Sequence, residues 1–154
     1  MLAAALALQL TTVLVFTTTD CPISNRYAPE IQRLSARFAN DFRFVFVYPV
    51  PSDSDEKIRE HRQKFGGGEW LRDPSQAMVK FSGVTVTPEV AIVTADNKIL
   101  YRGRIDDRYI GFGKDRPQPT VRDLERSLEA IGAGKPAPVA QTRAIGCIIS
   151  DLVK

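Results

Sequence analysis

Residues 11–29 read TTVLVFTTTDCPISNRYAP, a pattern that predicts a buried strand running into an amphipathic helix. The strand covers residues 12–16, the helix starts at Pro22, and Cys21 lies at the turn between them. The N–H groups of a helix's first turn favour an anion, so we expect a thiol pKa below the usual ~8.5. Cys21 is therefore a candidate nucleophile. The alternative is a small apolar side chain packed in the turn, since free cysteine is among the most buried residue types.

The segments that follow Cys21 complete a β-α-β unit. Apolar residues recur at three- and four-residue steps and predict a helix over residues 23–39, which Pro29 should kink. Residues 43–48 predict a second buried strand. A polar helix then runs to about residue 65, where residues 66–68 (Gly-Gly-Gly) end it. A short helix over residues 73–81 has Asp73 as its N-cap and Pro74 at its first position.

Strands return in the second half of the chain. Residues 88–94 and 98–103 predict a β-hairpin with its turn at Asp96 and Asn97. The last clear helix begins at Thr120, with Asp123 completing a capping box, and ends at Gly132. We therefore expect one domain over residues 11–131, followed by a linker and an apolar tail over residues 132–154 that carries Cys147.

Length and composition fit this plan. A chain of 154 residues with 44% hydrophobic content suits one compact domain that needs no disulfide to support it. The net charge of +3 is spread along the chain, which gives little support to nucleic-acid binding. The chain's 2 cysteines lack the spacing of zinc ligands, so we expect neither a metal nor another cofactor.

Residues 1–10 form an apolar N-terminal segment with two readings. It has the small-residue character of a secretory signal, of which it would be a remnant, but no Lys or Arg precedes it. It can equally be a first strand or helix of the domain. A membrane span is disfavoured because such a span needs ~20 apolar residues, and Gln9, Thr11 and Thr12 interrupt this one.

The order of elements resembles the thioredoxin-like superfamily from about residue 11 to residue 131. Cys21 matches the attacking thiol at the start of the first core helix, and Pro29 matches the proline that kinks that helix. Thr87-Pro88, before the hairpin, looks like the family's cis-proline. The resemblance implies a three-layer α/β/α fold with a central mixed sheet. It also implies that Pro22, Thr87 and Pro88 bind an extended substrate segment.

The insert over residues 49–84 is more similar to redoxins and peroxiredoxins than to minimal thioredoxin. Two departures matter. Thioredoxins carry a second cysteine where this chain has Ser24, so a local disulfide cannot form. Peroxiredoxins have a threonine or serine where Thr18 stands, which would hold a peroxide oxygen, but they have a proline where Leu14 stands. Their activating arginine has no matching motif here, and the available candidates are more simply read as solvated surface charges: Arg26, Arg102 and Arg104.

Cys147 is the candidate resolving thiol. It lies 126 positions after Cys21, and peroxiredoxins with two working cysteines often carry the second near the C-terminus. The 16 residues from Ile131 span ~50 Å when extended, so the tail can reach the active site of its own chain or of a partner in a dimer. The alternative is an apolar docking tail with an inert thiol.

His61 is the chain's only histidine. Copper-delivering members of the superfamily use a distant histidine with two close cysteines, but Asn25 stands where the second thiol would be. Because charged residues surround His61 on a polar helix, we expect it to be a solvated surface residue.

These observations favour a thiol-disulfide oxidoreductase that uses Cys21 as its single nucleophile, with an external thiol as reductant. Its substrate would be a protein disulfide or a peroxide, which leaves a peroxiredoxin-like thiol peroxidase as the alternative enzyme. A redox-inactive binding module that keeps the fold is the non-enzymatic alternative, and Ser24 is the feature in its favour. The resemblance to exported bacterial redoxin-domain proteins favours an extracytoplasmic location, in bacteria the periplasm.

Overall fold

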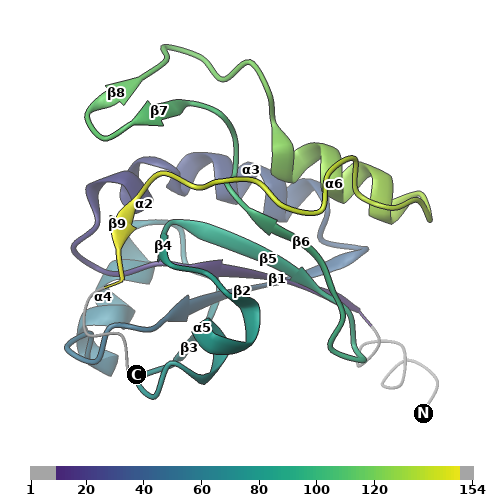
Figure 1. Ribbon diagram of the computed structural model, residues 1–154. Helices are drawn as coiled ribbons and strands as arrows, with labels where there is room; N and C mark the ends of the chain where they lie inside the picture. Colours follow the sequence, from purple (N-terminus) through teal and green to yellow (C-terminus); the bar gives the residue numbers. More distant parts are fainter. Residues whose placement is uncertain (1–9, 150–154) are drawn as a thin grey trace.

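The computed structural model describes residues 10–149, and its centre is a five-stranded mixed sheet (Figure 1). The strand order is β3-β2-β1-β5-β6. Strand β1 pairs parallel with β2 and antiparallel with β5. The strand bounds are Thr11–Phe16 (β1), Phe42–Tyr48 (β2), Glu69–Arg72 (β3), Glu89–Val93 (β5) and Ile99–Gly103 (β6).

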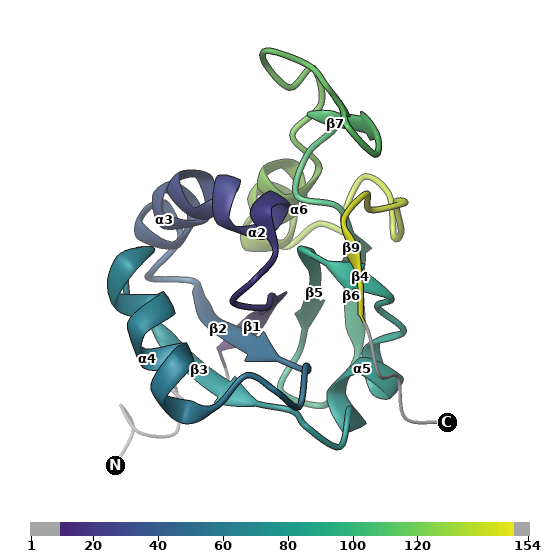
Figure 2. The same cartoon turned by 90° about the vertical axis from the view of Figure 1, so that its left-hand side faces the viewer.

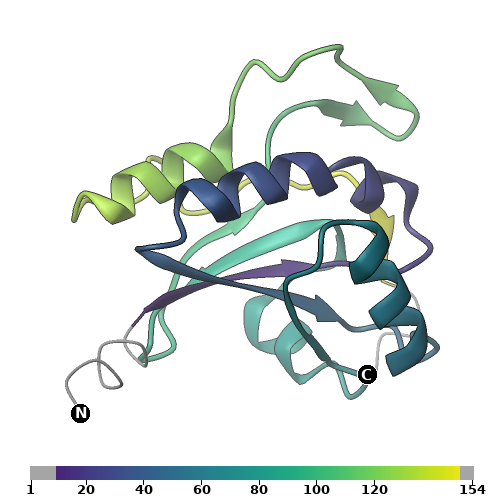
Figure 3. The same cartoon turned by 180° about the vertical axis from the view of Figure 1, so that it is seen from behind.

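Helices cover both faces of this sheet, which confirms the predicted three-layer α/β/α fold (Figure 3). Strand β1 shows how the two faces arise, because successive side chains of a strand point to opposite sides. Val13 and Val15 belong to the core under helices α3 and α6, whereas Leu14 and Phe16 belong to the core beneath α5. The helices are Pro22–Arg26 (α2), Ala28–Arg37 (α3), Asp55–Lys64 (α4), Ala77–Ser82 (α5) and Asp123–Gly132 (α6).

The predicted helix over residues 23–39 is two helices. Tyr27 ends α2 as its C-cap and is the N-cap of α3, and Pro29 lies in the first turn of α3. A proline there costs no hydrogen bond, because the first N–H groups of a helix have no partner within it. Pro29 therefore marks a helix start and not a kink within one helix.

Two other helix starts were predicted too early. Helix α5 begins at Ala77 and not at Asp73, because the Asp73 carboxylate reaches forward to accept hydrogen bonds from the N–H groups of Met78 and Val79. Helix α6 begins at Asp123 and not at Thr120. The Thr120 N–H donates to Asp107, so residue 120 is held outside the helix.

Two short strand pairs lie outside the main sheet. Strands β7 (Tyr109–Gly111) and β8 (Lys114–Asp115) form an arm that projects beyond α2 and α6 (Figure 2). Strands β4 (Val86–Thr87) and β9 (Cys147–Ile148) pair antiparallel, so the C-terminal segment returns to the loop before β5. The segment 144–149, expected to be an apolar tail, is thus a packed part of the domain. The expectation for residues 1–10 falls outside the described residues, except at Leu10.

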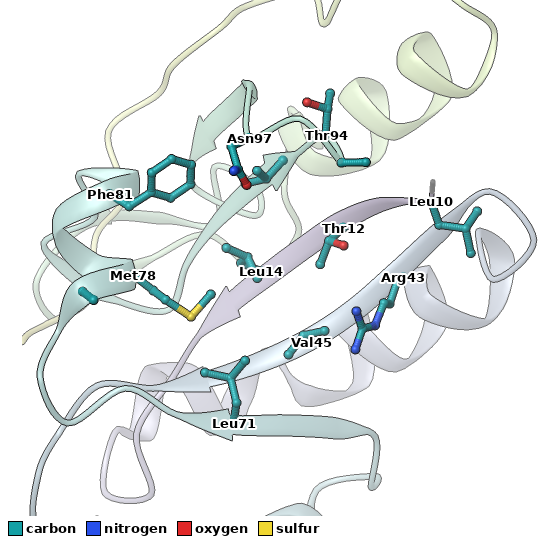
Figure 4. Close-up of a pocket in the computed structure, with 13 residues that line it drawn as sticks. Leu10, Thr12, Leu14, Arg43, Val45, Leu71, Met78, Phe81, Thr94 and Asn97 are labelled. Carbon is teal, nitrogen blue, oxygen red and sulfur yellow. The ribbon is translucent and has the colours of Figure 1, made fainter. Parts of the chain in front are cut away.

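A cavity of about 540 Å³ lies on the α5 face of the sheet, between that helix and the ends of β1 and β2 (Figure 4). Leu14, Val45 and Met78 line it, and neither cysteine does. Within residues 10–149, no helix is long and apolar enough to cross a membrane.

Candidate functional site

Cys21 lies where β1 ends and α2 begins. It is the N-cap of α2, and its sulfur accepts a hydrogen bond from the Ser24 backbone N–H at 3.4 Å. The predicted strand-to-helix position is therefore correct. The residue is only 1% exposed, however, and so is less accessible than a free nucleophile needs to be.

Cys147 is what covers Cys21. The two sulfur atoms lie 2.6 Å apart, although both residues are free thiols. Strand β9 holds Cys147 there, because its register pairs Cys147 with Thr87 on β4. A disulfide S–S bond is about 2.0 Å long, so oxidation of the two thiols to a disulfide would need only a small approach of the sulfurs. The structure thus brings together, within one chain, the two cysteines that the sequence left 126 positions apart.

The environments of the two thiols differ. Burial raises the pKa of Cys21, but hydrogen bonds to its sulfur from Cys147 and from the Ser24 backbone N–H outweigh that effect, so the pKa lies below its usual value. Burial and the hydrogen bond to Cys21 raise the pKa of Cys147 above its usual value. Because the thiolate is the attacking form, Cys21 is the better nucleophile of the pair.

Thr87 lies against both cysteines, and Pro88 follows it in the chain. Their peptide bond is cis, and the Thr87 carbonyl oxygen accepts a hydrogen bond from the Cys21 thiol at 3.2 Å. Thr87 is 1% exposed, and its hydroxyl has no hydrogen-bond partner among residues 10–149. Pro22 is exposed in the first turn of α2. A cavity of about 210 Å³ opens between Cys21, Cys147 and Thr87.

Thr18 lines the same cavity, but its hydroxyl is engaged elsewhere. It donates to the Asp53 carboxylate at 2.6 Å, and the backbone N–H and hydroxyl of Thr19 donate to the same carboxylate. Asp53 is 2% exposed and follows strand β2 in the chain. The predicted role of Thr18 requires its hydroxyl to contact a peroxide oxygen, whereas in this structure the hydroxyl donates to Asp53. Thr18 instead fixes the loop before Cys21.

His61 is buried, and the prediction of a solvated surface residue was wrong. Its Nε2 lies 2.6 Å from the Asn25 side-chain oxygen on α2, and its Nδ1 lies 2.7 Å from the Tyr48 hydroxyl on β2. Arg62 donates to the same hydroxyl, which leaves the Tyr48 proton to be donated to His61. Burial and then the Arg62 charge lower the pKa of His61 to about 4, so the imidazole is neutral.

A sequence signal for this network existed. His61 and Arg62 follow Ile58 at three and four positions, and residues at that spacing share one face of a helix. Ile58 is fully buried, so α4 turns that face inward despite its charged composition. The network ties α2, which carries the Cys21 turn, to β2 and α4.

The candidate arginines are held in ion pairs away from the sulfurs. Arg26 pairs with Asp115, Arg102 with Glu89 and Arg104 with Asp123. The expectation of solvated surface charges is thus too simple for Arg102 and Arg104, because their partners Glu89 and Asp123 are buried. Between residues 10 and 149, no group of three or more potential ligands forms a metal site.

Comparison with known proteins places this geometry in context. The profile of a thioredoxin-like family matches residues 10–99. No protein of curated function matches the chain. Among solved structures, an uncharacterized conserved protein from Geobacillus kaustophilus is 27% identical, with a TM-score of 0.79 over 92% of this chain and 77% of its own.

Two further structures share the fold at lower identity. A hypothetical protein from Sinorhizobium meliloti is 24% identical, with a TM-score of 0.78 over 96% of this chain and 82% of its own. A secreted Mycobacterium tuberculosis disulfide oxidoreductase homologous to E. coli DsbE is 20% identical. Its TM-score is 0.52, over 84% of this chain and 85% of its own.

Proposed function

The chain belongs to the thioredoxin-like family, and from this premise we propose that it is a thiol-disulfide oxidoreductase in which Cys21 attacks and Cys147 resolves. The observation that carries the proposal is the 2.6 Å approach of the two sulfurs. The opposite pKa shifts of the two thiols support this division of roles. The fold that the chain shares with a disulfide oxidoreductase is consistent with it.

The reaction follows from these roles. The Cys21 thiolate attacks one sulfur of a substrate disulfide, and the other substrate sulfur leaves as a thiolate that takes up a proton. Cys147 then loses its proton and attacks the Cys21 sulfur of the mixed disulfide, which releases the second substrate thiol. The substrate has gained two electrons, and the protein holds a Cys21–Cys147 disulfide. An external dithiol returns both cysteines to the reduced state.

Ser24 does not prevent this cycle. A thioredoxin-type resolving cysteine would stand at that position, but here resolution would come from Cys147 on β9. The second thiol is therefore supplied by strand pairing and not by the next helical turn. This also distinguishes the proposal from a redox-inactive binding module, for which a second thiol in contact with Cys21 has no use.

Single-cysteine variants test the proposal. We expect Cys21→Ser to abolish the reduction of a disulfide-bonded protein substrate, and Cys147→Ser to stop after the first attack. Mass spectrometry should then show a substrate adduct on Cys21 in Cys147→Ser and an internal disulfide in the unsubstituted protein. If Cys21 stays reduced in every form, with disulfides and with peroxide alike, the oxidoreductase proposal is wrong and the binding module takes its place.

A further inference from the structure

The C-terminal segment lies in the domain as an extended peptide beside the reactive cysteine. Its first part runs along β6, where the Arg102 N–H donates to Ala140 and the Thr142 N–H donates to Arg102. Its last part pairs with β4, and the Ile149 N–H donates to the Thr85 carbonyl oxygen at 3.1 Å. The segment thus occupies the edge of β4, next to Cys21, that any other extended cysteine-containing segment would need.

The residue before Cys147 has no room for a side chain. A Cβ added at Gly146 would lie 2.2 Å from the Thr87 carbonyl oxygen and 2.7 Å from its carbon. These are backbone atoms, and the same carbonyl accepts the Cys21 thiol hydrogen bond, so the contact has little freedom to relax. Gly146 has no positive φ, so its backbone conformation does not require glycine. The requirement is steric and comes from the β4 edge that holds residues 146–149, which we call the groove.

The two residues after Cys147 differ in how far the domain buries their side chains. Ile148 lies at the rim of the cavity beside Cys21, and its side chain is 76% exposed. Ile149 is 2% exposed and packs in the core cluster that contains Leu14, Phe16 and Val84. The site therefore accepts any side chain at the first position after the cysteine and requires a large aliphatic one at the second.

We propose that this groove selects protein substrates whose reactive cysteine lies in an extended Gly-Cys-X-aliphatic segment, and that residues 146–149 are the resident copy of that segment. The inference rests on the proposed function and names its substrate class. A substrate must displace the resident segment before its sulfur reaches Cys21.

Activated peptides test this selectivity. The probe is the capped peptide Arg-Ala-Ile-Gly-Cys-Ile-Ile, residues 143–149, with its cysteine joined to 5-thio-2-nitrobenzoate as a disulfide. Attack of the Cys21 thiolate on the peptide sulfur joins the peptide to Cys21 and releases the coloured thiolate. The protein is the full chain carrying Cys147→Ser, so that Cys21 is its only thiol, with and without Gly146→Val to unseat the resident segment.

We expect the peptide with valine in place of its glycine to react slower by roughly tenfold or more, because overpacking against fixed backbone atoms is strongly unfavourable. Serine at the final isoleucine should slow the reaction by roughly tenfold, since the buried aliphatic contact is lost. Serine at the isoleucine directly after the cysteine should leave the rate unchanged. Gly146→Val in the protein should speed the reaction of the parent peptide.

Glutathione disulfide is the control that separates the two proposals. If Cys21 fails to react with it and with every peptide, the proposed function is wrong. If Cys21 reacts with it but the four peptides react at equal rates, the function stands and the selectivity is overturned. The Cys147→Ser chain with the native Gly146 should show the same order of peptides at lower rates, and a different order would also contradict the groove.

Discussion

At the scale of single residues, the site depends on an unequal pair of thiols. Cys21 is buried and Cys147 is partly buried, and burial alone would raise both pKa values. Only Cys21 also sits at a helix start, with the Ser24 N–H directed at its sulfur. The proton is therefore better placed on Cys147, which in the proposed reaction donates a hydrogen bond to the Cys21 thiolate before its own attack.

Replacing that donor should change the titration of Cys21. We expect Cys147→Ala to raise the pKa of Cys21, because the thiolate loses a hydrogen bond that lowers it. Cys147→Ser keeps a hydroxyl donor and should raise the pKa less. Rates of alkylation by iodoacetamide across pH measure both values. Equal pKa values in the two variants would show that Cys147 does not stabilise the thiolate.

At the scale of elements, the Cys21 turn is fixed from two sides. Asp53, in the loop after β2, holds the threonines before Cys21, and His61 on α4 holds Asn25 in the helix after it. Neither contact involves a reacting atom. Together they explain why a five-residue helix, too short to be stable alone, keeps a defined orientation at the active site.

The His61 contact predicts a dependence of stability on pH. The pKa of His61 is about 4 in the folded protein, against ~6.5 for an unperturbed histidine, so the unfolded chain binds the proton more readily. Stability from this group is present above pH ~6.5 and is lost as the pH falls toward about 4, by on the order of 3 kcal/mol. Urea unfolding at several pH values measures it.

The matched variant is His61→Gln, which has no titrating group. It should lose less stability than the unsubstituted protein over the same pH range, since carboxylates titrate in both. Parallel pH profiles for the two proteins would mean that His61 is protonated equally in the folded and unfolded states.

Sequence patterns predicted the elements with strong local signals and missed those that depend on distant partners. Apolar runs located β1, β2, β5 and β6, and the Cys21 turn followed from them. Strand β3 was missed because its residues, Glu69–Arg72, are only half buried and lack alternation. The inward face of α4 was missed because its burial depends on Tyr48 and Asn25, which the chain brings from other elements.

At the scale of the whole molecule, a contact between residues 126 positions apart governs the redox site. The sequence showed that the tail is long enough to reach Cys21, but its length does not determine which strand the tail pairs with. The β4–β9 pairing is two residues long on each side, and so short a ladder leaves no periodic pattern to detect. The pairing of the tail with β4 depends on Gly146 and Ile149, and their packing against the β4 edge can be recognised only in the folded protein.

Closing the Cys21–Cys147 disulfide should stabilise the fold. A crosslink across a loop of this length removes up to about 4 to 5 kcal/mol of unfolded-state entropy, and we expect an observed gain of about 2 to 4 kcal/mol. Urea unfolding of the oxidised protein should therefore have a higher midpoint than unfolding in excess dithiothreitol. Cys147→Ser should show no difference between the two conditions. If the unsubstituted protein has the same urea midpoint with and without dithiothreitol, the disulfide does not form.

The hydrogen bonds between Arg102 and residues 140 and 142 also bear on self-association. Strand β6 is the last strand of the sheet, and an open edge strand is a template for pairing with another copy of the chain. Residues 140–142 lie over that edge. They precede, in the chain, the segment that pairs with β4 through Cys147. If β9 is released in the proposed cycle, residues 140–142 still cover the sheet edge, so the proposed disulfide exchange would not expose a surface that promotes aggregation.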